Sequence, residues 1–272
     1  MAAQKHASIY PSSLQLRHYS KKGGKVPGTS KPAELKAIAW RGPLTPALAA
    51  NGINAAIRNA RRLLNDATTL YNIGGFPSAT ALGILAIEEY GKVNIIHQIL
   101  LAKTDSARRK VWREYTSHTA KNTAWVMPNL VKPGARSVDD FRMLFEREAK
   151  HQYVLDDFKQ WSLYTECRGA AWSEPAQNVT AEMAIEILNH AYSLITLQPE
   201  FSAERMQIYV KHLSPVWTER NEDANTTAIR NALADYTKEC QQRGWMKQGV
   251  DPHEFFKSKV SEASVTGNGE AH

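Results

Sequence analysis

Residues 54–97 read NAAIRNARRLLNDATTLYNIGGFPSATALGILAIEEYGKVNIIH, and the fold can be worked outward from this stretch. Its first half repeats apolar side chains at helical spacing, which predicts a helix with one apolar stripe. The stripe consists of Ile53, Ile57, Ala60, Leu64, Ala67 and Tyr71. Gly74 and Gly75 end this helix, and Pro77 begins the next one, with Ser78 as its expected N-cap.

The second half of the stretch is apolar on most sides, which predicts a helix in the buried centre of a bundle. It nevertheless carries Glu88-Glu89-Tyr90-Gly91-Lys92 in its middle. Glu88 and Lys92 are four residues apart, in the order that favours an ion pair. Adjacent carboxylates point about 100° apart on a helix. At least one of Glu88 and Glu89 should therefore face packed structure and need a partner there.

The rest of the chain also has helical patterns, with no repeat and no segment of strand periodicity. We predict helices at about residues 46–73, 79–102, 105–126, 137–155, 180–198, 202–213 and 225–243. The segment 158–167 fits either a helix or extended chain, and 168–178 fits a loop. The chain is thus predicted to be an all-α bundle, with Trp112, Trp125, Trp161 and Trp172 in its core.

Composition limits the class of protein. The chain has 272 residues, of which 43% are hydrophobic, so it can bury a core as one large domain or two small ones. Its longest apolar segment, 79–101, is interrupted by charged residues, so no membrane span is expected. No signal peptide is recognisable, and Cys167 and Cys240 lie far apart. These features predict a cytoplasmic protein.

Charge divides the chain into three parts. Residues 1–43 hold eight basic residues and one acidic residue, so they account for the whole net charge of +7. We expect 1–43 to be a flexible basic leader, 44–245 to be the folded body, and 246–272 to be a polar tail. A basic arm can add salt-dependent affinity for phosphate. The alternative is a solubilising leader, or a start that is wrongly placed.

Several kinds of site are not indicated. The sequence lacks GxGxxG, P-loop, HExxH and GxSxG motifs, and its nine histidines lack the i,i+3 or i,i+4 pairing of metal ligands. We therefore expect neither a metal nor another cofactor. A DNA-reading helix-turn-helix would need a basic recognition helix, which is also missing.

One group of residues in the central stretch resembles a known family. The group consists of Asn59-Ala60, Leu63, Asp66-Ala67, Gly74, Ala81-Leu82, Ala86, Glu88-Glu89 and Gly91-Lys92. This pattern is similar to that of the AbiV family, abortive phage infection proteins within the HEPN group of helical domains. The run Ala-x-Glu-Glu-x-Gly-Lys at 86–92 is its most specific part, and the likeness covers roughly 50–200. The resemblance implies a HEPN-like helical bundle. The helical patterns beyond it predict a C-terminal helical extension, and the composition of the ends predicts disordered termini.

Arg113 and His118 are separated by four residues. They resemble the R-x4–6-H signature of HEPN ribonucleases, which implies metal-independent cleavage of RNA. A histidine can move the 2′-hydroxyl proton, and an arginine can hold the phosphate as charge develops. Tyr115 and Lys121 lie nearby and are expected to support RNA binding, by stacking and by phosphate contact.

The spacing of Arg113 and His118 raises a geometric question. Residues five apart on an unbroken helix point about 140° apart, so the two side chains can converge only at a helix break or across a homodimer interface. His118 also falls on an apolar stripe with Val111 and Tyr115, which favours a hydrogen-bonded core histidine as the alternative.

The polar residues of the central stretch have two interpretations. Asn59, Asp66, Glu88, Glu89 and Lys92 can form a buried polar network that fixes the register of the first two helices. Alternatively, the acidic pair lies beside the Arg–His site and orients it.

Together these observations predict an antiphage abortive-infection effector that arrests growth through RNA cleavage at Arg113 and His118. Its expected partners are a second copy of the chain, RNA, and a phage or host protein as trigger. The alternative is a non-catalytic effector that binds a phage or host protein and blocks translation.

Overall fold

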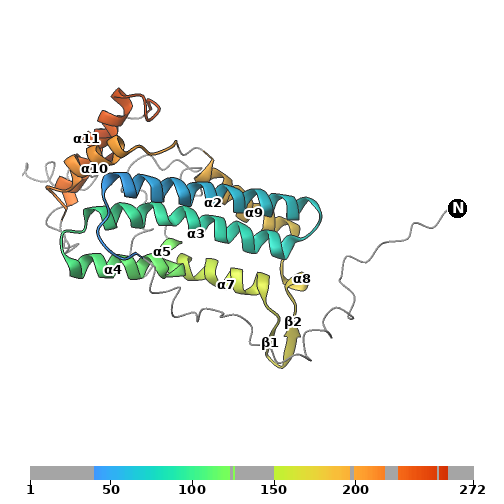
Figure 1. Ribbon diagram of the computed structural model, residues 1–272. Coiled ribbons are helices and arrows are strands. Elements are labelled where there is room, and N and C mark those ends of the chain that lie inside the picture. Colours follow the sequence, from blue (N-terminus) through green and yellow to red (C-terminus); the bar gives the residue numbers. More distant parts are fainter. Residues whose placement is uncertain are drawn as a thin grey trace, which may run out of the picture. The chain divides into compact units, whose positions relative to one another are not determined.

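The computed structural model describes residues 40–122, 125, 150–196, 199–217, 226–249 and 251–256. Two long helices lie at its centre, α2 (Pro46–Asn72) and α3 (Phe76–Leu101). They run side by side in opposite directions, joined by a short turn (Figure 1). Among the described helices, none combines the length and the apolar character needed to cross a membrane.

The other described helices pack on this pair or on one another. They are α4 (Asp105–Thr116), α5 (His118–Lys121), α7 (His151–Leu163), α8 (Pro175–Asn178), α9 (Ala181–Ile195), α10 (Ala203–Leu213), α11 (Thr226–Gln242) and α12 (Pro252–Phe256). The helix α9 packs against both α2 and α3, while α4, α5 and α7 follow one another along α3 (Figure 1). The helix α10 packs on α2, α11 on α10, and α12 on α11. The all-α prediction is therefore confirmed.

The apolar stripe of α2 is buried as predicted except at Tyr71, which is half-buried, and the helix has the expected ends. Thr45 caps the helix by accepting a hydrogen bond from the Leu48 N–H (3.2 Å), and a proline occupies the first turn, where no N–H is needed. Gly74 ends the helix in the left-handed region at φ 83°, a conformation that glycine adopts without strain.

The helix α3 is buried on most sides, again as predicted, because α2, α7 and α9 cover it. Its start differs from the expectation. The N-cap is Gly75 and the helix begins at Phe76, so Ser78 already lies inside the first turn and is not the cap. Pro77 fits that first turn because its missing N–H would have no helical partner there.

The third predicted helix is broken. Instead of running over 105–126, α4 ends at Thr116, and Ser117 adopts an extended conformation (φ −81°, ψ 132°). The Ser117 hydroxyl accepts a hydrogen bond from the Ala120 N–H (3.4 Å) and so caps the short helix α5. A serine side chain offers the backbone this alternative to continuing the helix.

The segments after α5 follow the predictions in part. The expected helix 137–155 lies mostly outside the described residues, which resume at 150. The segment 158–167 is helical as far as Leu163 and then extended. The expected loop contains a small antiparallel hairpin of β1 (Glu166–Arg168) and β2 (Ala171–Ser173), followed by α8. The predicted absence of strands is therefore wrong for these residues.

The core consists of the α2 stripe packed on α3, α9 and α10, with further clusters between α10 and α11 and between α3 and α4. Trp112 and Trp125 are half-buried. Trp172 is 74% exposed and Trp161 is 38% exposed, so the prediction of a core position is wrong for these two. The predicted helices 180–198, 202–213 and 225–243 correspond to α9, α10 and α11, and α12 adds a short helix within the segment 246–272.

Candidate functional site

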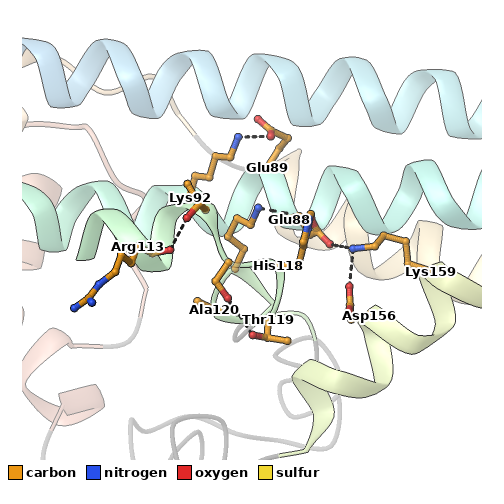
Figure 2. Close-up of polar contacts among 12 residues, drawn as sticks. Glu88, Glu89, Lys92, Arg113, His118, Thr119, Ala120, Asp156 and Lys159 are labelled. Carbon is orange, nitrogen blue, oxygen red and sulfur yellow. Dashed lines mark hydrogen bonds and ion pairs between the residues drawn. The ribbon is translucent and has the colours of Figure 1, made fainter. Parts of the chain in front are cut away.

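The candidate site is centred on the carboxylate of Glu88. This side chain projects from α3 towards α5 and α7 and is only 4% exposed. Its Oε2 lies 2.7 Å from Nδ1 of His118, and its Oε1 accepts a hydrogen bond from Nζ of Lys159 at 2.6 Å (Figure 2). The expectation that one of the two adjacent carboxylates faces packed structure and needs a partner is thus confirmed, and Glu88 is that carboxylate.

Lys159 connects α7 to this carboxylate. Its ammonium donates to Asp156 Oδ1 (2.7 Å) as well as to Glu88 Oε1. Burial opposes the charge on Lys159, but the hydrogen bonds to Asp156 and Glu88 outweigh this effect and raise its pKa. A buried carboxylate without such a cation would be costly, so Lys159 compensates for the burial of Glu88.

Lys121 lies on the same side of Glu88. Its side chain is 8% exposed and its Nζ is 3.8 Å from Glu88 Oε2. Burial lowers its pKa, against the attraction of Glu88. An ammonium turned into the interior is badly placed to contact a phosphate, so the position of Lys121 fits a supporting role better than direct RNA contact.

His118 is the exposed member of the group. Its side chain is 57% exposed, while Nδ1 is held by Glu88. The alternative of a core histidine is therefore wrong, because the stripe on which it was expected ends at the break at Ser117. In a neutral ring, an Nδ1–H that donates to the carboxylate leaves the lone pair on Nε2. The result is an imidazole fixed at one nitrogen and available at the other.

Gly91 makes the close approach of α5 to α3 possible. It lies one turn after Glu88 on α3, where the backbone of α5 passes directly against it. A Cβ at this position would overlap the backbone carbonyl of Lys121. The Glu-Glu-x-Gly run therefore places a carboxylate and a gap for the neighbouring backbone on adjacent turns of one helix.

Arg113 is not brought to His118 within one chain. It is exposed on α4, and Figure 2 shows its side chain directed away from His118 and Glu88. The break at Ser117 thus brings His118 to Glu88 without bringing Arg113 along. Tyr115 is half-buried, with its ring against Trp112 (5.3 Å between centroids) and beneath the ammonium of Lys92 (5.2 Å). These contacts occupy the Tyr115 ring.

The five polar residues of the central stretch do not form one network among the described contacts. Lys92 pairs with Glu89 rather than with Glu88, so the predicted i,i+4 pair is wrong. Glu88 is turned instead towards α5 and α7. Asn59 and Asp66 both bind Arg62 on the exposed side of α2, with Arg62 Nη1 2.9 Å from Asp66 Oδ2.

Sequence reasoning missed Asp156 and Lys159. The only local signal is their i,i+3 spacing, which many solvent-exposed pairs share. Glu88, His118 and Asp156 offer ligand atoms within 4.8 Å of one another, as a divalent ion would require. However, the Lys159 ammonium is hydrogen-bonded to both carboxylates and occupies the place of such a cation.

Comparison with known proteins identifies the family. No curated protein and no protein of solved structure matches the chain significantly. The AbiV family model of the HEPN group matches residues 48–196, which is more than half of the chain. This range includes Glu88, His118 and Lys159. The chain therefore belongs to the AbiV family of HEPN-type helical proteins, a family of abortive infection proteins.

Proposed function

We propose that this protein is an antiphage abortive-infection effector that arrests growth by cleaving RNA, with His118 as the general base. The observation that carries the proposal is the 2.7 Å contact between Glu88 Oε2 and His118 Nδ1, which joins a buried carboxylate to an exposed imidazole. A base oriented in this way by a third group is a recurring arrangement in catalysis by proton transfer. Family membership supports the defence role.

The proposed reaction needs a single proton shuttle. Nε2 of His118 takes the proton of a ribose 2′-hydroxyl, and the 2′ oxygen attacks the adjacent phosphorus. The bond from phosphorus to the 5′ oxygen breaks, and the proton passes back to that oxygen directly or through water. The products are a 2′,3′-cyclic phosphate and a 5′-hydroxyl. Glu88 fixes the ring and stabilises the imidazolium that forms between the two proton transfers.

A second copy of the chain would supply the phosphate-binding group. Because Arg113 is directed away from His118 of its own chain, a two-fold pair in which Arg113 of one copy approaches His118 of the other would complete the site. The guanidinium fork can hold two phosphate oxygens as charge develops on them. The homodimer is therefore part of the proposal, and a phage or host protein as trigger stays a prediction.

The test is incubation of the purified full-length protein with total cellular RNA, with and without a chelator. We expect cleavage that resists the chelator and leaves cyclic phosphate ends. In the variant His118→Ala the rate should fall by about 10²–10⁴. The matched control is His253→Ala, because His253 is also exposed (43%) and close to a carboxylate, Asp235 Oδ1 at 3.2 Å.

Two results would contradict the proposal: cleavage at the same rate in wild type and His118→Ala, or no cleavage by folded wild type. In the second case the alternative function, a non-catalytic effector that blocks translation by binding, becomes the better one. Addition of the protein to a cell-free translation reaction, with RNA integrity followed in parallel, separates these two functions.

A further inference from the structure

The exposed face of α4 carries a hollow of about 600 Å³, of which the proposed reaction uses only Arg113. We call it the arginine hollow. It is lined by Arg41, Ser106, Arg109, Trp112, Arg113 and Thr116. All of these except Arg41 belong to α4, and Arg41 comes from the segment that precedes α2. The hollow is therefore one face of a helix with an arginine from another segment at its rim.

Positive charge is concentrated in the arginine hollow. Arg109 and Arg113 are one turn apart and exposed, and neither has a carboxylate partner among the residues that the structure describes. Arg108, on the same helix, is paired with Asp105. Two like charges at i,i+4 repel each other and destabilise a helix. A bound anion would remove this repulsion.

Planar groups border these charges. The Arg41 guanidinium lies over the Trp112 ring, 5.0 Å from its centroid. The indole Nε1–H donates to the backbone carbonyl of Gly42 at 3.1 Å, which fixes the segment that carries Arg41. Guanidinium planes and aromatic rings are the groups on which unpaired bases stack in proteins that bind single strands.

We propose that the arginine hollow binds a single-stranded segment of the RNA substrate. Arg109 and Arg113 would hold successive phosphates, with the hydroxyl of Ser106 as a further donor, and a base would stack at Arg41 and Trp112. The inference rests on the proposed function, since it supplies that reaction with a second subsite. The carboxylates of an acidic peptide could pair with Arg109 and Arg113, but such a peptide would have no base to stack at Arg41 and Trp112.

The position of the hollow along the chain agrees with this role. The hollow ends at Thr116, and His118 begins the next helix two residues later. On the other side, Arg41 belongs to the basic segment 1–43, whose charge favours the same ligand. Within one chain, Arg113 thus contributes to binding of the strand, and in a two-fold pair it would present that strand to the imidazole of the other copy.

The experiment measures binding without cleavage. A short fluorescent 2′-O-methyl oligoribonucleotide cannot form a cyclic phosphate, so fluorescence anisotropy reports its affinity for the wild-type full chain. The variants are Arg109→Gln and Arg113→Gln, and the matched control is Lys110→Gln, which removes the same charge from the same helix outside the hollow. We expect each arginine variant to bind about tenfold more weakly at low salt. The slope of the logarithm of affinity against the logarithm of salt concentration should fall by about one for each arginine removed. The affinity and slope of the control should change little.

The inference is overturned if Lys110→Gln weakens binding as much as Arg109→Gln, because the effect would then be one of overall charge. It is also overturned if a polyglutamate peptide or a free mononucleotide competes as well as the oligonucleotide. Cleavage assays separate this result from the proposed function. If His118→Ala cleaves RNA as fast as wild type while the arginine variants still bind more weakly, the proposed reaction alone is rejected. If His118→Ala loses cleavage while the arginine variants bind as tightly as Lys110→Gln, the arginine hollow alone is rejected.

Discussion

The α carbon of Gly91 in α3 lies against the backbone carbonyl of Lys121 in α5, with no space for a Cβ between them. This contact determines how closely α5 approaches α3. Because His118 is the first residue of α5 and Glu88 lies one turn before Gly91, the same contact sets the distance between imidazole and carboxylate. A glycine inside a helix costs about 0.5–1 kcal/mol relative to alanine, so its presence here is explained by the approach of α5.

Replacement of Gly91 by alanine should therefore separate α5 from α3. We expect Gly91→Ala to destabilise the fold by about 1–3 kcal/mol, as overpacking does. We also expect it to abolish RNA cleavage in the fraction that stays folded, because His118 moves away from Glu88. Urea unfolding and the cleavage assay measure the two effects separately.

Gly52→Ala is the control for this substitution. Gly52 also lies inside a helix, but a Cβ there would meet only the Ile96 side chain at an ordinary 3.5 Å. This variant should be at least as stable as wild type, because alanine is the better helix former. If Gly91→Ala were as stable and active as Gly52→Ala, the proposed constraint on α5 would not exist.

The two adjacent carboxylates should differ sharply in their importance for stability. Glu88→Ala leaves Lys159 and Lys121 buried without their shared partner, so we expect a loss of about 3–5 kcal/mol. The side chain of Glu89 is 21% exposed and pairs with Lys92 within one helix. Its replacement by alanine should cost about 1 kcal/mol or less. Equal losses in the two variants, measured by denaturant unfolding, would contradict this assignment of the buried partner.

The basic leader should add RNA affinity without contributing to the fold. Deletion of residues 1–39 keeps Arg41, which lies over Trp112, and should leave the helix content and melting temperature unchanged. RNA binding should weaken most at low salt, because fewer counterions are released. A leader of the same length with glutamine in place of lysine and arginine should behave like the deletion. A truncated protein that fails to fold would show that the domain boundary near residue 43 is wrong.

The active unit should be a homodimer with shared sites. Arg113→Ala and His118→Ala should each be folded and inactive. Mixing them under conditions of subunit exchange should restore about a quarter of the wild-type activity, because half of the pairs then hold one intact composite site. Size-exclusion chromatography with light scattering gives the oligomeric state. A wild-type protein that is monomeric at micromolar concentration and still cleaves RNA would rule out the shared site.

His97 should make the fold sensitive to mild acid. Burial, with a smaller contribution from Arg205, lowers the pKa of His97 from 6.5 to about 4, against the effect of its hydrogen bond to Val93. The folded protein therefore binds fewer protons than the unfolded chain between these values, so stability falls as pH falls through this window. The slope should reach up to about 1.4 kcal/mol per pH unit.

The variant His97→Phe tests this slope. A phenyl ring can keep the edge contacts with Phe201 and Tyr209 but cannot be protonated. The urea midpoint of the variant should depend less on pH than that of wild type, whereas His253→Ala should keep the wild-type dependence. An unchanged slope in His97→Phe would assign the acid sensitivity to other groups.

The central pair of helices could be predicted from the sequence because each carries a strong local pattern. The stripe of α2 and the nearly uniform apolar character of α3 need no knowledge of the partner helix. The break at Ser117 could not be predicted in this way, because the apolar periodicity continues past it and the serine gives only a weak capping signal. The same periodicity suggested a buried stripe as the alternative position of His118, which is exposed instead.

The pairing within the site is decided by tertiary structure. The spacing along α3 predicts an ion pair between Glu88 and Lys92. In the structure, α5 and α7 bring His118, Lys121 and Lys159 to Glu88 instead. Local sequence could identify a carboxylate in need of compensation but could not say which cation would supply it. Trp172 shows the same limit, since an aromatic residue suggests a core position and only the hairpin geometry exposes it.

The hydrogen bond from Lys159 to Glu88 joins residues that are 71 positions apart in the chain. During synthesis, α3 and α5 leave the ribosome well before α7. A nascent chain that ends after α5 already contains Glu88, His118 and Lys121, but it lacks Lys159, the lysine that donates a hydrogen bond to the buried carboxylate. The order of synthesis would thus delay assembly of the site until α7 has emerged.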